Sequence, residues 1–223
     1  MAEGFRLRVC YRKSGRLRYL SHLEVGHGCE RAARRARLPY AVSQGFTPRM
    51  RVAFGPALPV GTAGEREYYD LVLTQFVPAA EACAALAAVT ADDLAPLECV
   101  YVSGREKSLA AALTIADYDV TVEGGIPPEE LERSLRALTD GGTLSVDHKG
   151  KQKVFDLAEA LPKEPEVMSV EGRCVVRMTV RMGEQGSLRP EVFVAAALGR
   201  DVRTAVTRTG LFVEDEGVWR RPL

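Results

Sequence analysis

The residues best suited to chemistry gather between Arg18 and Arg51, a stretch that holds two of the three histidines and seven arginines. The spacing Ser21-His-Leu-Glu24 is that of a capping box, so it predicts a helix start. A neutral His22 imidazole there could act as a general base toward an RNA 2′-hydroxyl, or hydrogen-bond a ligand. The alternative is a histidine that fixes the strand-to-helix junction through a backbone hydrogen bond. His27 lies about 140° around the helix from His22, so the pair does not form a metal site.

A loop rich in glycine and proline follows this helix, from Ser43 to Arg51. Gly45 permits unusual backbone angles, and Pro48 stiffens the turn. Phe46 could stack on a nucleic-acid base, while Arg49 and Arg51 could form paired hydrogen bonds with phosphates. Alternatively, Phe46 packs the loop against the core, as aromatic residues between glycine and proline often do.

Strand alternation adds two further arginines. Apolar residues alternate with Arg6 and Arg8 in the segment 5–11, which predicts a strand. If the apolar side chains face the helices, both arginines face the open side of the sheet, where Arg49 and Arg51 join them from the next strand. In RNA-binding modules of this topology, the open sheet face reads the RNA. Asp70 shares that face and could neutralise part of it.

The end of the predicted helix is basic as well. Arg31, Arg34 and Arg35 lie at i, i+3 and i+4 and form a stripe. Since the helix dipole favours cations at a C-terminus, a solvated stripe is a sufficient explanation. The candidate residues for binding RNA or another ligand are therefore Arg6, Arg8, His22, Arg34, Arg35, Ser43, Gln44, Phe46, Arg49 and Arg51. A catalytic role is considered for His22 alone.

The formal net charge of zero hides a strong segregation of charge. Residues 1–55 carry twelve basic and three acidic residues, and residues 65–140 carry five basic and fifteen acidic residues. A basic block of this kind suits phosphates or an acidic partner. It would equally suit the acidic block of the same chain, and the sequence leaves both alternatives open.

The predicted elements form two modules of the α+β class. In residues 1–103, strands near 5–11, 50–54, 69–73 and 97–101 alternate with helices near 21–37 and 78–89. This order, βαββαβ, is that of an antiparallel ferredoxin-like module. Residues 115–223 approximately repeat it, with an extra hairpin between 144 and 157. Residues 157–170 receive no assignment.

The composition places few further demands on function. The 223 residues are 46% hydrophobic and 27% charged, as in ordinary globular proteins. The five cysteines are widely spaced and form no CxxC pair, so we expect no disulfide framework, metal site or cofactor. No apolar run approaches the roughly 20 residues that span a bilayer, and no signal peptide is recognised, so a cytoplasmic protein is expected.

The stretch "GRLRYLSHLE…ERAARRARLP…SQGFTPRMRVAFGPALPVG…EREYYD" resembles the radical SAM-linked protein family. Members of this family are domains of unknown function fused to, or encoded beside, B12-binding radical SAM proteins. The match includes Ser21, His22 and Leu23, while Glu24 and Thr47 replace the usual Asp and Asn. The resemblance implies a radical SAM enzyme as partner and an RNA setting. The chain itself lacks the three-cysteine cluster that holds a [4Fe–4S] centre, so it would act as an accessory protein.

Three functions are thus compatible with the sequence. The first is a non-catalytic RNA-binding accessory to a radical SAM enzyme that acts on RNA or a ribosomal substrate. The second is a metal-independent endoribonuclease that uses His22, with arginines stabilising the phosphorane. The third is a purely structural interaction subunit.

Overall fold

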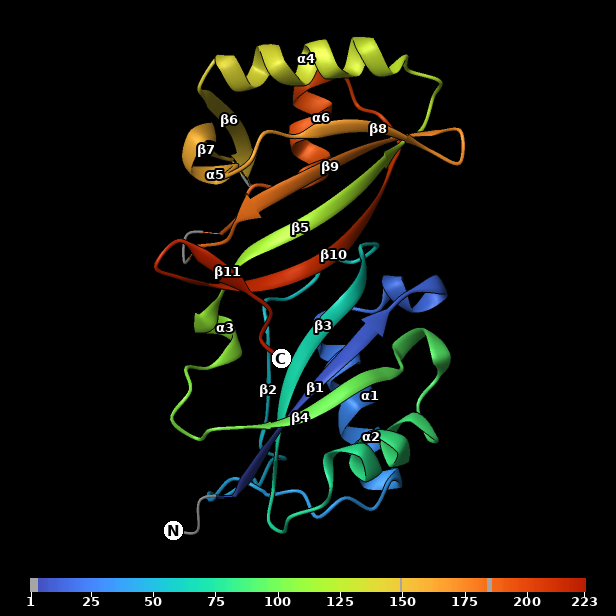
Figure 1. The fold of residues 1–223 in the computed structure, drawn as a ribbon, viewed down its shortest axis with the longest axis vertical. Coiled ribbons are helices and arrows are strands. Elements are labelled where there is room, and N and C mark those ends of the chain that lie inside the picture. Colours follow the sequence, from blue (N-terminus) through green and yellow to red (C-terminus); the bar gives the residue numbers. More distant parts are fainter. Residues whose placement is uncertain (1–3, 149, 184–185) are drawn as a thin grey trace. The chain divides into compact units, whose positions relative to one another are not determined.

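The computed structural model describes residues 4–148, 150–183 and 186–223, which form two compact units (Figure 1). The first unit comprises residues 1–113 together with 220–223, and the second comprises residues 114–219. Residues 220–223 thus belong to the first unit, whereas the sequence places them in the second module. The residues described contain no helix that is long and apolar enough to cross a membrane.

The first unit has the predicted order of elements. Its strands pair in the order β4-β1-β3-β2, and each of these pairs is antiparallel. Short 3₁₀ turns at Gly15–Tyr19 and Asp92–Leu94 and the four-residue α3 (Leu109–Ala112) complete the unit. The main elements are β1 (Phe5–Lys13), α1 (His22–Arg35), β2 (Val52–Phe54), β3 (Ala63–Leu73), α2 (Ala79–Ala87) and β4 (Pro96–Val102).

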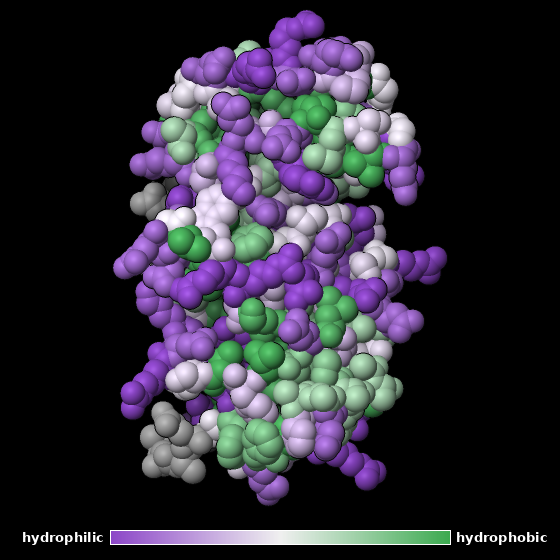
Figure 2. Space-filling model, viewed as in Figure 1, coloured by the Kyte–Doolittle hydropathy of each residue, from purple (hydrophilic) through white to green (hydrophobic). Residues whose placement is uncertain are grey.

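Alternation along the strands builds the core of this unit. Leu7 and Val9 are fully buried in one cluster with Val25 of α1 and Leu86 of α2, so this face of the sheet lies under the two helices. Phe5 was predicted on the same face but is 42% exposed, because it lies at the strand end. Its ring instead contacts the rings of Phe76 and Tyr101. Figure 2 shows hydrophobic residues gathered over the neighbouring α2, whose exposed positions are mostly alanine.

The predicted capping box starts α1. The Ser21 hydroxyl accepts from the backbone N–H of Glu24, and the Glu24 carboxylate accepts from the backbone N–H of Ser21. Two N–H groups that the first helical turn leaves unpaired are thereby satisfied. The helix ends at Arg35, two residues earlier than predicted, since Arg37 has a positive φ of 55°.

The second unit contains a sheet and a separate hairpin. Its strands pair in the order β10-β5-β9-β8, with β11 beside β10, while β6 and β7 form the predicted extra hairpin. The pairs β5–β9 and β8–β9 are antiparallel. The elements are β5 (Leu113–Val122), α4 (Pro128–Asp140), β6 (Thr143–His148), β7 (Lys151–Asp156), α5 (Leu157–Ala160), β8 (Glu166–Val170), β9 (Arg173–Arg181), α6 (Pro190–Leu198), β10 (Thr204–Asp215) and β11 (Val218–Arg220).

Two features of this unit were not predicted. The unassigned residues 157–170 form α5 and the short β8, which pairs only at the edge of the sheet. In addition, β10 runs without a break from Thr204 to Asp215, although Gly210 lies within it. A Cβ at this position would lie 2.8 Å from the Phe212 ring, so glycine makes room for that ring rather than for a turn. The predicted α+β class is confirmed, with mostly antiparallel strands.

The capping box predicts a specific stability effect. Replacing Ser21 with Ala leaves the N–H of Glu24 without its acceptor, so the first unit should lose about 1 kcal/mol of unfolding free energy in urea denaturation. Ser108 is the matched control, since it occupies the N-cap of α3 without a side-chain hydrogen bond. Equal losses from Ser21→Ala and Ser108→Ala would show that the box contributes nothing specific.

Candidate nucleic-acid interface

The loop from Ser43 to Arg49 is closed at its base by hydrogen bonds. The Ser43 N–H donates to the Arg49 carbonyl (2.8 Å), and the Arg49 N–H donates to the Ser43 hydroxyl (3.0 Å). Next to them, Val42 and Met50 form an isolated antiparallel bridge. The base therefore has a defined backbone, while every residue from Val42 to Arg49 is exposed.

Phe46 stands free at the tip of this loop. Its side chain is fully exposed (110% of the reference value), so it does not pack the loop against the core. The preceding Gly45 has a φ of 155°, which residues with side chains rarely adopt. The loop thus holds an aromatic ring in solvent, an arrangement suited to stacking on a base. Packing by Phe46, the alternative from the sequence, is not what the structure shows.

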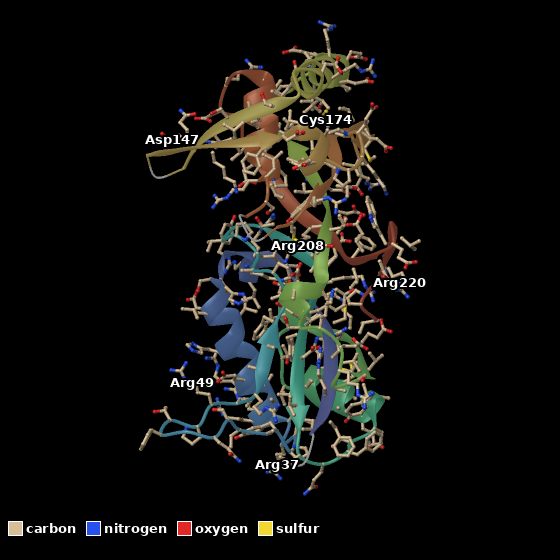
Figure 3. The ribbon with its side chains drawn as sticks, turned by 90° about the vertical axis from the view of Figure 1, so that its left-hand side faces the viewer. Arg37, Arg49, Asp147, Cys174, Arg208 and Arg220 are labelled. Carbon is tan, nitrogen blue, oxygen red and sulfur yellow. The ribbon has the colours of Figure 1, made fainter. Side chains whose placement is uncertain are left out.

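Two arginines flank the base of the loop. Arg49 and Arg51 are both exposed, and Figure 3 shows Arg49 projecting away from the ribbon. The Arg51 carbonyl accepts from the Val72 N–H (3.0 Å), and the neighbouring Val52 lies opposite Leu71. Since Val52 packs on the helix side, Arg51 faces the other side of the sheet, as predicted. The term "loop surface" is used below for Ser43, Gln44, Phe46, Arg49 and Arg51.

The basic end of α1 is also solvated. Arg34 and Arg35 are exposed, and Arg34 donates to the Glu30 carboxylate at 3.1 Å, one turn earlier. An exposed i,i+4 pair of this kind is weak. Both side chains therefore remain available to phosphates, although Arg34 already has a carboxylate neighbour.

His22 lies apart from the loop surface. Its exposed ring packs edge-on against Phe54, with 5.4 Å between the ring centroids. Phe54 is four residues from Met50 at the base of the loop, which in extended backbone is about 13 Å. His22 and the base of the loop therefore lie at opposite ends of this strand segment, so these two candidates from the sequence do not form one site.

Arg6 and Arg8 face the predicted side of β1, yet they do not form an open platform. Arg8 is 3% exposed and donates from Nε and Nη2 to both carboxylate oxygens of Asp70, at 2.8 and 3.1 Å. Arg6 Nε donates to the same carboxylate at 2.8 Å. Burial opposes the charge of Arg8, but Asp70 holds its pKa above the ordinary value. In this structure the guanidinium groups of Arg6 and Arg8 are bound within the protein and do not form an open surface for RNA.

A segment that the sequence reasoning missed covers these arginines. Arg6 donates from Nη1 and Nη2 to the carbonyls of Glu106 and Lys107, both at 2.9 Å. Arg8 Nη1 donates to the Glu106 carboxylate at 3.2 Å and to the Pro222 carbonyl at 3.0 Å. No local pattern in the sequence indicates these bonds, because they join residues about 100 or more positions apart.

Farther along the same face lie Cys10 and Tyr68, directly opposite each other on β1 and β3. Burial raises the pKa of Cys10 to about 11 and that of Tyr68 to about 12. Burial likewise raises the pKa of Cys29, in α1, to about 12. These thiols are therefore protonated near neutral pH and poor nucleophiles. Within the described part of the chain, no group of three histidine, cysteine or acidic residues could hold a metal ion.

Comparison with known proteins identifies the family of this chain. Residues 6–190 match the model of DUF2344, described as an uncharacterized protein conserved in bacteria. The chain belongs to this family. No curated protein matches it.

Among solved structures, this member of DUF2344 resembles a chain of a structure titled "Crystal Structure of a Cbf5-Nop10-Gar1 Complex". The TM-score is 0.50 and the sequence identity 13%, and the match covers 94% of this chain and 50% of that chain. The present chain thus spans half the length of its structural neighbour. At this identity the similarity concerns the fold alone.

The buried ion pair predicts a large effect on stability. Replacing Asp70 with Asn removes the carboxylate between two arginines and leaves Arg8 with only the half-exposed Glu106 carboxylate among its described partners, so about 3–5 kcal/mol of unfolding free energy should be lost. Asp119→Asn is the control, because Asp119 also binds an arginine through two bonds, but Arg177 there is 54% exposed. That change should cost less than about 1 kcal/mol. Similar losses in urea denaturation of both variants would contradict the assignment.

Proposed function

We propose that this protein is a non-catalytic RNA-binding accessory protein that contacts single-stranded RNA through its loop surface. The observation that carries the proposal is Phe46, an aromatic ring fully exposed on a loop with a fixed base. The ring is held in solvent by a loop whose base is closed without it, so its flat faces are available to a ligand. Bases are suitable ligands, since every base offers a flat face for stacking.

Arginines beside the ring supply the second requirement for RNA. Arg49 and Arg51 flank the base of the loop, and Arg34 and Arg35 add charge at the end of α1. Guanidinium groups donate paired hydrogen bonds to phosphate oxygens and neutralise their charge. A base stacked on Phe46 with its phosphates near these arginines would satisfy both parts of a nucleotide.

The arrangement of strands supports an RNA-binding module. We infer that the first unit is ferredoxin-like, from its antiparallel strand order β4-β1-β3-β2 and its two helices on one face. The order β10-β5-β9-β8 supports a second such module with the inserted β6–β7 hairpin. The aromatic strand residues of the common RNA-recognition motif are missing, so the loop would be the main contact.

The partner is proposed from the resemblance of the opening motif to radical SAM-linked proteins. In this proposal the chain presents RNA or a ribosomal substrate to a radical SAM enzyme, which supplies the chemistry. Purification of the native protein at low salt should recover such an enzyme, identified by mass spectrometry. Its repeated absence would remove the partner from the proposal and leave RNA binding to be judged separately.

The RNA proposal is tested with a fluorescent oligouridine of about twelve nucleotides, long enough for one or two binding modules. Phe46→Ala should weaken binding about 5- to 150-fold, the range expected for one stacked base. Arg49→Ala and Arg51→Ala should each lower the slope of log affinity against log salt by about 0.7. Fluorescence anisotropy at several salt concentrations measures both effects.

Matched controls separate specific loss from general damage. Val60 is an apolar residue of the same unit with 62% exposure, so Val60→Ala should bind RNA like the parent protein. Arg136 of α4 is 70% exposed and paired only with Glu132 one turn away, so Arg136→Ala should leave the salt slope unchanged. If Phe46→Ala binds as tightly as Val60→Ala, stacking by the loop is refuted.

The same assay distinguishes the two other functions. Metal-free cleavage of the RNA that His22→Ala abolishes would replace the proposal with the endoribonuclease. Absence of RNA binding at low salt would leave the structural subunit. Binding that survives His22→Ala, without cleavage, is the outcome expected here.

A further inference from the structure

The outward-facing N–H groups of Arg6 and Arg8 bind an exposed segment and, from Arg8 Nη1, the carbonyl of Pro222. We name residues 103–108, of sequence Ser-Gly-Arg-Glu-Lys-Ser, the strap. The strap supplies two carbonyls to Arg6 and the Glu106 carboxylate to Arg8. The inward-facing N–H groups of both arginines bind Asp70. Asp70 thus fixes the two guanidinium groups side by side, and the strap, together with the Pro222 carbonyl, occupies their remaining donors.

The contacts that hold the strap are weak compared with those beneath it. All six strap residues are exposed, and its turn is closed by one backbone bond, from the Glu106 N–H to the Ser103 carbonyl at 3.1 Å. The Glu106 side chain is 47% exposed, whereas Arg8 and Asp70 are 3% and 4% exposed. A half-exposed ion pair contributes little stability, and segments without buried apolar contacts open first. The arginine pair would therefore remain in place if the strap moved.

Charge decides what would replace the strap. With Glu106 in place, two arginines face two carboxylates, and the group is neutral. If the strap moved away with Glu106, one positive charge would lose its counter-charge, and Arg6 Nη1, Arg6 Nη2 and Arg8 Nη1 would each lose an acceptor. Arg8 Nη1 would keep its hydrogen bond to the Pro222 carbonyl. An oxyanion with several acceptor oxygens satisfies such a set, and arginine forks fit phosphate in particular.

We propose that Arg6 and Arg8 form a latent phosphate-binding site, and that Glu106 occupies the place of the phosphate while the strap is closed. Asp70 positions the two arginines. Because Asp70 is buried, the phosphate would displace Glu106 and not Asp70. The strap is thus an internal competitor, and phosphate binding and strap opening are linked. This goes beyond RNA binding by the loop surface, which requires no movement of the strap.

A second observation on the same sheet face also indicates a polar ligand. The Tyr68 hydroxyl lies two residues from Asp70 along β3, on the same side, and the residue is 1% exposed. The Tyr68 hydroxyl interacts with the Arg66 guanidinium and the Cys10 thiol, although no hydrogen bond of ordinary geometry reaches this hydroxyl or the buried Nε of Arg66 within the described residues. The face therefore carries further, incompletely hydrogen-bonded polar groups beside the arginine pair.

Inorganic pyrophosphate is the probe, because it carries the phosphate chemistry without a base for Phe46. Titration calorimetry should show that Glu106→Gln binds pyrophosphate at least about fivefold more tightly than the parent protein, since the competing charge is removed. Glu98→Gln is the matched control, with the same loss of charge, 48% exposure and an ion pair to Arg66 at 2.8 Å. Arg6→Gln introduced beside Glu106→Gln should abolish the gain.

Three outcomes would overturn the site. These are a folded Glu106→Gln variant without a gain, an equal gain in Glu98→Gln, or a gain that persists without Arg6. Hydrogen exchange on the unmodified protein is a second measurement, in which pyrophosphate should accelerate exchange in residues 103–108; unchanged exchange at saturating pyrophosphate also refutes the proposal. Titrating the Glu106→Gln variant with oligouridine as well as with pyrophosphate shows whether the site takes RNA phosphate or only free phosphate. Phe46→Ala should leave the pyrophosphate gain intact, so the two proposals can fail independently.

Discussion

The first unit depends on one buried ion pair between its two central strands. Arg8 of β1 lies directly opposite Asp70 of β3, and the two side chains are almost wholly buried. A buried arginine requires a carboxylate partner, and this requirement fixes the register of the strands. A slip by one residue would place Leu71 opposite Arg8 and turn the apolar residues away from the helices. The charged face and the apolar face of the sheet therefore enforce the same alignment.

The sheet's two faces serve different purposes as a result. Leu7, Val9 and Leu71 hold the helices on one side through apolar burial. On the other side, Arg6, Arg8 and Asp70 hold the strap and the tail residue Pro222 through directed hydrogen bonds. Apolar contacts are insensitive to small movements, whereas a hydrogen-bonded ion group can exchange one acceptor for another. A switchable contact is therefore more plausible on the charged face than on the apolar one.

The loop surface owes its exposure to a separate local arrangement. Two hydrogen bonds between Ser43 and Arg49 close the base of the loop, so Phe46 is not needed to hold it. Position 46 is thereby free to serve a ligand. The two basic regions consequently differ in kind: the loop arginines are open, and Arg6 and Arg8 are covered. The basic block in the sequence thus forms two separate regions in the structure, one exposed to solvent and one covered.

Local patterns in the sequence determined most of the elements. The capping box at Ser21 and the alternation in β1 depend on residues within one turn or a few strand positions, so they could be interpreted without the fold. The same alternation correctly placed Arg6, Arg8 and Arg51 on the side away from the helices. The short β8 and the continuous β10 were missed, because their residues form strands only against the neighbours that the sheet provides.

The tertiary structure alone decided which charged side chains are exposed and which are buried in ion pairs. The Arg8–Asp70 pair joins residues 62 positions apart, and Glu106 and Pro222 arrive from still farther along the chain. Strand pairing brings Asp70 to Arg8, and the segments after β4 and β11 bring Glu106 and Pro222, so the sequence could show the arginines but not their neutralisation. Likewise, His22 and Phe46 belong to the same basic stretch of the sequence, whereas His22 packs on Phe54, eight residues beyond Phe46. The sequence thus determined the side chains and their facing, and long-range packing decided which of them a ligand can reach.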